Sequence, residues 1–401
     1  MSPIPRYRPY VGPPIFSAGF RPFFLGAAAW SAVAVPLWLA AYLTSIDVPT
    51  LLPPAAWHVH EMVYGFAAAT VAGFLLTAIP NWTGRMPLQG WPLAALVLLW
   101  AAGRLAVLFS AALGAVAAAA IDLAFPALFL AVVAREILAG RNWRNLPMLA
   151  ALSLLLVGNL LVHLEALDIA DTADVGNRIG VATLLTLISL VGGRIVPSFT
   201  RNWLAKARPE VAPPVSEGSL DRAVLAITAL ALSLWAFFPE ATITAWMVLV
   251  TGLAVSFRLA RWRGWSTWPE PLLLILHMGY GWLAAGLLLL GLNHLFDILP
   301  QTAALHALTA GAIGTMTLAV MTRASLGHTG RPLSARTATR IIYSLVTLAA
   351  LLRVLSPFAG NSLGPILWLA GAAWTGAFGL FVFFYGGPLA RQRVEARATP
   401  I

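Results

Sequence analysis

The densest group of candidate metal ligands in the chain consists of His58, His60, Glu61 and Met62. In a regular helix His58 shares a face with Glu61 and Met62, whereas His60 lies nearly opposite, with Tyr64 one turn further along. We therefore expect the two imidazoles to have different partners. Glu61 could accept the second ring proton of a metal-bound imidazole and so fix the orientation of that ring. The alternative interpretation is a belt of Trp and His side chains at a membrane surface.

A second candidate site begins at His306, which is followed at helical spacing by Ala310 and Gly314. Small residues beneath an axial histidine leave room for a haem, and they equally permit close packing of helices. Small residues also follow His58 and His60, so the two helices could hold a haem between them.

Copper is the second cofactor that the donor types suit, because imidazole and thioether ligands bind it and the chain has no cysteine. For His163 the alternative is a structural role, since Asn159, Glu165 and Asp168 could satisfy an interfacial histidine. His294, beside Asn293, has the same alternative. His277 could bind a further haem, serve a proton path or be a core histidine. The candidate haem ligands are His58, His60, His277 and His306, and the candidate copper ligands are His58, His60, Met62, His163, His294 and His306.

Charged residues are few within the apolar segments. Arg104 and Asp122 lie on consecutive segments, where we expect them to form an ion pair rather than a proton relay. Basic residues also gather after two later segments, where they could bind haem propionates or another anion. The excess of basic residues that is usual in cytoplasmic loops is the alternative explanation. The candidate anion-binding residues are Arg194, Arg201, Asn202, Arg323, His328 and Arg331.

The composition shows which elements must position these side chains. Of 401 residues, 60% are apolar and only 10% are charged, and the mean hydropathy is +0.82, which excludes a soluble globular protein. The net charge of +10 does not indicate nucleic-acid binding, because the basic residues are spread between long apolar runs. The absence of cysteine excludes disulfides, iron–sulfur clusters and thiolate-bound zinc.

Apolar runs of about 20 residues predict an all-α, polytopic membrane bundle with twelve transmembrane helices. We expect a single transmembrane domain over residues 1–401, with an N-terminal arm at 1–21, a proline-containing loop at 198–219 and a basic tail at 386–401. The predicted spans are about 22–44, 56–80, 91–110, 113–135, 146–167, 176–197, 220–238, 241–262, 271–293, 301–324, 335–356 and 361–385.

The distribution of arginine and lysine predicts the orientation of these spans. Of the 25 basic residues, 22 lie at the termini or in every second loop, and acidic residues predominate in the other loops. Because basic loops stay in the cytoplasm, both termini are expected to be cytoplasmic.

The second, sixth and tenth spans each end in a Thr/Arg cluster, at Thr83, Thr200 and Thr322. This recurrence raises the hypothesis of three repeated units of four helices.

Several motifs make the chain resemble the NnrS family of twelve-span haem- and copper-containing membrane proteins. They extend from residue 16 to residue 331 and include two distinctive segments, one around His58 and His60 and one around His328. The matching segments are FSAGFRPFF at 16–24, WHVHEM at 57–62, GFLLTAIPNWTG at 73–84, GGRIVP at 192–197, TRN at 200–202, HALT at 306–309 and SLGHTGR at 325–331.

The resemblance implies a protein of the bacterial inner membrane that binds b-type haem and copper, interacts with nitric oxide or iron–nitrosyl species, and protects against nitrosative stress during denitrification. It implies neither catalytic turnover nor a particular redox partner. One alternative is a secondary transporter for an anionic or metal-containing solute, although no matched pair of broken helices near mid-membrane supports it. Another is a non-catalytic scaffold for the assembly of a respiratory reductase.

Overall fold

The computed structural model describes residues 10–394, and helices are the only regular secondary structure in that range. The predicted N-terminal arm and basic tail therefore lie partly outside the described residues. Twelve helical segments in this range are long and apolar enough to cross a membrane, which confirms the prediction of an all-α, twelve-span protein. The spans are Phe20–Leu43, Pro54–Thr83, Trp91–Leu108, Ala115–Ala139, Trp143–Ala166, Ala173–Ala207, Ser219–Phe237, Thr242–Ala260, Pro271–Phe296, Gln301–His328, Thr337–Phe358 and Gly360–Ala390.

Several spans are built from more than one helix. The α-helices are α1 (Phe20–Leu43), α2 (Pro54–His60), α3 (Ala68–Thr83), α4 (Trp91–Leu108), α5 (Ser110–Leu113), α6 (Ala115–Ala139), α7 (Leu146–Ala166), α8 (Ala173–Leu187), α9 (Gly193–Ala207), α10 (Ser219–Phe237), α11 (Thr242–Ala260), α12 (Pro271–Phe296), α13 (Gln301–His306), α14 (Thr315–His328), α15 (Thr337–Leu355) and α16 (Leu363–Ala390). The sixth span differs most from its predicted bounds, because α9 continues through polar residues to Ala207 and occupies part of the predicted loop 198–219.

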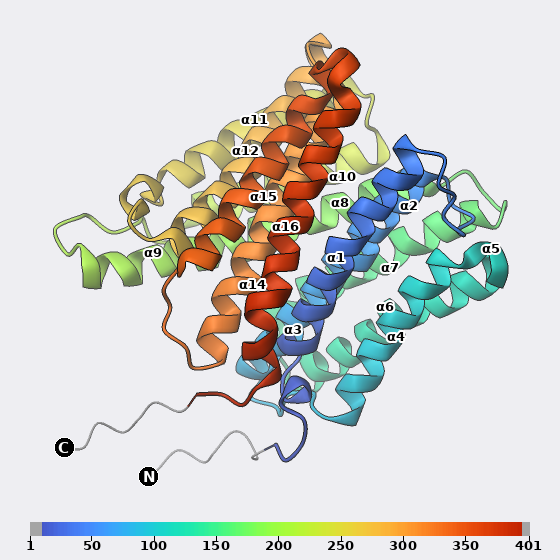
Figure 1. Cartoon of the computed structure of the whole chain (residues 1–401). Coiled ribbons are helices and arrows are strands. Elements are labelled where there is room, and N and C mark those ends of the chain that lie inside the picture. Colours follow the sequence, from blue (N-terminus) through green and yellow to red (C-terminus); the bar gives the residue numbers. More distant parts are fainter. Residues whose placement is uncertain (1–9, 395–401) are drawn as a thin grey trace. The chain divides into compact units, whose positions relative to one another are not determined.

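The turn between the third and fourth spans is one of the two shortest connections in the predicted bundle. The short helix α5 and Gly114, whose φ is +82°, reverse the chain there, so that α4 and α6 pack side by side (Figure 1). A positive φ is accessible to glycine at little cost, which explains how so short a connection can turn.

Three π-helical segments interrupt the second, sixth and tenth spans. They are η2 (Glu61–Ala67), η4 (Ile188–Gly192) and η6 (Ala307–Gly314). A π-helical turn inserts an extra residue and changes which side chains share a face, and such turns are frequent at functional sites. Their occurrence in the same three spans that carry the Thr/Arg clusters supports the hypothesis of three repeated units of four helices.

The chain divides into two compact units. Unit 1 comprises Met1–Gly180, Met321–Leu333 and Phe378–Ile401, and unit 2 comprises Val181–Val320 and Ser334–Ala377. In the described part of unit 1, α1 packs on α3, and α6 packs on both α4 and α7. In unit 2, α12 packs on α11 and on η6. Many large apolar side chains are exposed on the spans, as expected for surfaces that face lipid.

Candidate metal centre

A buried polar network in unit 1 joins four consecutive spans. His60 ends α2 and Glu61 begins η2, while α4 supplies Arg104, α6 supplies Asp122, and α7 supplies Asn159 and His163. These side chains are between 0% and 4% exposed. Because polar groups within a membrane bundle are costly unless they are paired, such a network indicates a functional site.

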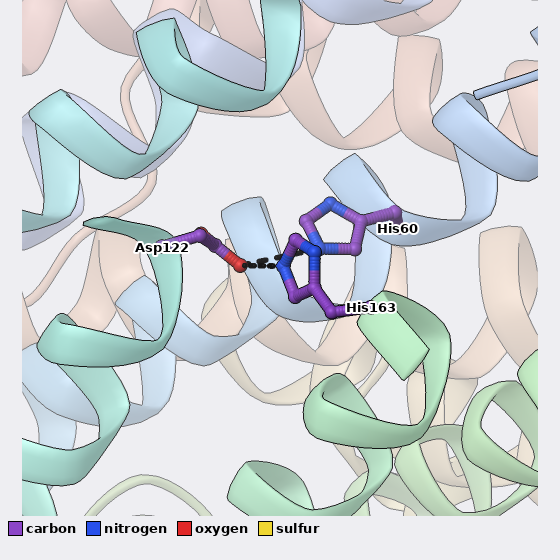
Figure 2. Close-up of side chains that lie close together, drawn as sticks. All are labelled: His60, Asp122 and His163. Atoms are coloured by element: carbon purple, nitrogen blue, oxygen red, sulfur yellow. Dashed lines mark hydrogen bonds and ion pairs between the residues drawn. The ribbon is translucent and has the colours of Figure 1, made fainter. Parts of the chain in front are cut away.

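The centre of the network is formed by His60, Asp122 and His163, which together could hold a metal ion. Their candidate ligand atoms all lie within 4.8 Å of one another. The Oδ2 atom of Asp122 lies 2.9 Å from Nε2 of His163 and 3.3 Å from Nε2 of His60. Figure 2 shows both imidazoles directed at this one carboxylate oxygen. The three donors come from three different helices, so tertiary folding alone brings them together.

Two further side chains orient these donors. Oε1 of Glu61 lies 3.0 Å from Nδ1 of His60, which leaves Nε2 of that ring directed towards Asp122. Asn159 donates through Nδ2 to Oδ2 of Asp122 at 2.8 Å, and its Oδ1 lies 2.9 Å from Nε2 of His60. Partners of this kind fix the tautomer and the direction of metal-binding imidazoles.

Arg104 of α4 bridges the two carboxylates of the network. Its Nη1 donates to Oε1 and Oε2 of Glu61 at 2.9 and 2.8 Å, and its Nη2 donates to Oδ1 of Asp122. Trp30 also donates to Glu61, at 2.6 Å. The guanidinium can approach so closely because Gly65 has no side chain: a Cβ there would lie 2.8 Å from Nη1 of Arg104. The predicted ion pair between Arg104 and Asp122 is confirmed.

The network has room for one further positive charge. With neutral imidazoles, the carboxylates of Glu61 and Asp122 and the single guanidinium of Arg104 leave one negative charge. Both ring nitrogens of His60 face oxygen atoms, whereas a neutral imidazole carries only one N–H. A cation between Nε2 of His60 and Asp122 would satisfy the second nitrogen and offset this negative charge. A second proton on His60 has the same effect when no metal is bound.

The structure gives His58 and His60 different partners. The ring of His58 stacks on Trp38, with centroids 4.0 Å apart. Tyr64 donates its hydroxyl to the carbonyl of Gly176 at 2.6 Å, and its ring centroid lies 5.6 Å from that of His60. Met62 is half-buried.

Sequence reasoning missed Asp122 as a partner of His60 and His163. It assigned Glu165 as one possible partner of His163, whereas Glu165 accepts hydrogen bonds from the backbone N–H groups of Thr172 and Ala173. The available signal was the isolated acidic residue at the centre of an apolar helix. The π-helical turn after His60 was also missed, because the residue types around it do not distinguish a π-helical turn from an α-helical one.

The remaining candidate histidines lie in unit 2. His306 and His294 each have Nδ1 close to a carbonyl one turn earlier in their own helix, at 2.7 Å from Thr302 and 2.9 Å from Leu290. Nε2 of His277 lies 2.9 Å from Oγ1 of Thr200, and its Nδ1 is buried without a hydrogen-bond partner.

The small residues after His306 are covered by indole rings. A Cβ at Gly311 would lie 2.7 Å from Trp282, and one at Gly314 would lie 2.6 Å from Trp374. In unit 1, a Cβ at Gly73 would lie 2.8 Å from the ring of Phe24. In this structure these stripes are therefore packing surfaces.

The candidate anion-binding residues lie in both units. In unit 2, Arg194 and Asn202 are exposed, and Arg201 donates to the carbonyl of Pro214 at 3.3 Å. In unit 1, Arg323 is half-buried. The other two, His328 and Arg331, also belong to unit 1.

Unit 2 contains a second buried ion pair that sequence reasoning missed. Arg258 of α11 bonds through Nε to Oδ1 of Asp221 in α10 at 3.0 Å, and through Nη1 to the carbonyl of Ser189 and the hydroxyl of Tyr280, each at 3.1 Å. Gly193 provides the space for this guanidinium.

Fold and site together define a polytopic helical membrane protein with a buried histidine and carboxylate centre. The family model described as NnrS protein matches residues 14–393, so the chain belongs to the NnrS family. No curated protein matches the chain.

Proposed function

We propose that this chain is a metal-binding protein of the bacterial inner membrane that interacts with nitric oxide and protects against nitrosative stress during denitrification. The observation that carries the proposal is the cluster of His60, Asp122 and His163, in which three donors from three helices meet at a buried, negatively charged point. Membership of the NnrS family supports the nitric oxide part of the proposal.

The donor set suits a transition metal that accepts imidazole and carboxylate ligands. Two imidazoles and a carboxylate without thiolate fit copper(II), which we propose as the resident ion, and the same set also occurs at non-haem iron(II) sites. A bound copper or iron ion would supply the chemistry of nitric oxide binding. Because nitric oxide is small and apolar, it can reach a buried site from the bilayer without a polar channel.

The surrounding residues hold the ligands in place. Glu61 accepts the Nδ1 proton of His60 and thereby leaves Nε2 as the donor atom. Asn159 holds Asp122 between the two imidazoles, and Arg104 prevents mutual repulsion of the two carboxylates. Metal binding requires His163 to release the Nε2 proton that it otherwise shares with Asp122.

For the haem that the resemblance implies, the described residues give one observation in favour and one against. The contact between Nδ1 of His306 and the carbonyl of Thr302 favours a lone pair on Nε2, as iron ligation needs. The small residues that would face the macrocycle, however, are covered by Trp282 and Trp374. The proposed function therefore does not depend on haem, and the optical spectrum tests whether haem is bound.

The test is metal analysis and an oxidised-minus-reduced optical spectrum of the purified full-length protein, produced with sufficient copper, iron and haem precursors. We expect about one copper ion per chain at the cluster, and weaker retention of copper in the variants His60→Gln, Asp122→Asn and His163→Gln. His294→Gln is the matched control, because this histidine contacts a carbonyl of its own helix in unit 2.

A folded protein free of copper and iron would overturn the proposal and favour the transporter alternative, for which solute uptake would then be measured. Iron in place of copper would keep the site and correct the identity of its ion.

A further inference from the structure

Basic side chains gather at the ends of three helices in unit 1. Arg21 lies in the first turn of α1, His328 ends α14, Arg331 follows α14, and Arg393 follows α16. The family-like segments around Arg21 and His328, far apart in sequence, therefore meet at one end of their helices. The proposed metal centre uses none of these residues.

Arg21 is buried, with 4% of its surface exposed. Its Nη1 donates to the carbonyls of Leu389 and Arg391 at 2.7 and 2.6 Å. These carbonyls lie at the C-terminal end of α16, where a positive charge is favourable. This arrangement fixes Arg21 in position, but the two carbonyls stabilise only this one of the four basic groups.

The other basic groups lie close to Arg21 without a compensating charge. Arg331 lies within the range of charge–charge interaction with Arg21, and both Arg21 and Arg393 lie within that range of His328. The ring of His328 packs on Phe20 at a centroid distance of 5.3 Å. The backbone N–H of Val394 donates to the carbonyl of Thr329 at 3.0 Å, which holds the segment with Arg393 against the loop that carries Arg331.

The donor that points to a ligand is Nη1 of Arg331, which is buried and has no hydrogen-bond partner. Within residues 10–394, the ion pairs of the structure involve none of Arg21, His328, Arg331 and Arg393. Gathering cations around an unsatisfied buried guanidinium N–H is costly unless an anion binds among them.

We propose that Arg21, His328, Arg331 and Arg393 form a binding site for a phosphate group. Guanidinium groups bind phosphate through strong, charge-assisted hydrogen bonds. The site lies at helix ends, and basic pockets at such positions bind the head groups of anionic lipids at the membrane surface. A lipid phosphate and free inorganic phosphate share this chemistry, and the experiment separates the two sources.

The experiment uses the delipidated full-length protein in neutral detergent. Binding is measured by native mass spectrometry and by the thermal midpoint, with phosphatidylglycerol, phosphatidylcholine and inorganic phosphate as separate probes. We expect phosphatidylglycerol to bind and to raise the midpoint. Arg331→Gln should weaken this binding about fivefold, whereas Arg331→Lys should retain most of it. The matched control is Arg336→Gln, which removes an exposed arginine nearby in sequence.

Stabilisation by phosphatidylglycerol alone would identify a lipid as the source, and equal stabilisation by inorganic phosphate would identify the free anion. Unchanged binding in Arg331→Gln, or an equal loss in Arg336→Gln, would overturn the proposal. Glu395 lies outside the described residues. Tighter phosphatidylglycerol binding by Glu395→Gln would also overturn the proposal, because that carboxylate would then be the resident counterion.

Discussion

At the residue scale, the chemistry depends on which polar side chains meet inside the bundle. The pair of Arg104 and Asp122 could be predicted, because two opposite charges at similar depth on consecutive spans have few other partners. The convergence of His60 and His163 on Asp122 could not be predicted, because it depends on how three helices are rotated about their axes. Asp122 was distinctive as an isolated acidic residue in an apolar helix, but Glu165 lies much nearer to His163 in the sequence and was therefore one of the expected partners.

Removal of the charge on Glu61 should weaken metal binding without removing a ligand. In Glu61→Gln the amide keeps the shape of the side chain but loses the carboxylate that accepts from His60 and Arg104. We expect the metal affinity to fall about 10- to 100-fold, as measured by competition with a chelator. Glu136→Gln, which alters a pair with the partly exposed Arg85, serves as the control. An unchanged affinity in Glu61→Gln would show that the contact does not orient the ligand.

Removal of the guanidinium of Arg104 should destabilise the fold. Arg104→Met leaves the buried carboxylates of Glu61 and Asp122 without their shared partner, which should lower the free energy of unfolding by about 3–5 kcal/mol. Denaturant titration in detergent micelles measures this change. The double variant Arg104→Met/Asp122→Asn should recover part of the loss, because it removes one of the stranded charges. A single variant as stable as the unaltered protein would contradict this account of the network.

At the element scale, the π-helical segments and the glycines beside them position the buried arginines. Gly65 in η2 makes room for Arg104, and Gly193 directly after η4 makes room for Arg258. In each case the arginine pairs with an aspartate on the neighbouring span. The Thr/Arg clusters suggested a repeat from sequence, but the π-helical turns that strengthen it could not be predicted, because one extra residue per turn leaves no distinct composition.

A methyl group at Gly65 should therefore disturb the metal centre. In Gly65→Ala the new Cβ would lie 2.8 Å from Nη1 of Arg104 and 2.9 Å from Oε2 of Glu61. We expect weaker metal retention and a lower thermal midpoint. Gly364→Ala is the control, because no atom lies within 4 Å of a Cβ at that position and the substitution should be neutral or slightly stabilising. Equal behaviour of the two variants would refute the packing argument.

At the scale of the whole molecule, the sequence predicted the helical class and all twelve spans, because apolar length and loop charge are properties of the whole chain. The predicted ends of the spans were less accurate where a helix continues through polar residues beyond the apolar run, as α9 does. The orientation of the spans stays a prediction from the positive charges.

This orientation can be tested with single cysteines, because the chain has none of its own. Ser45 and Ser216 are exposed in two loops that the charge pattern places on opposite sides. We expect a membrane-impermeant maleimide to label Ser45→Cys in intact spheroplasts, and to label Ser216→Cys only after the membrane is permeabilised. The reverse pattern would invert the predicted topology.

The central claim is that His60, Asp122 and His163 bind one metal ion. The most direct measurement is pulsed electron paramagnetic resonance of the purified, copper-loaded protein, which counts the imidazole nitrogens bound to copper(II). The account predicts two imidazoles in the unaltered protein and one in His163→Gln. A copper signal without imidazole nitrogens, or one that is identical in His163→Gln, would contradict it.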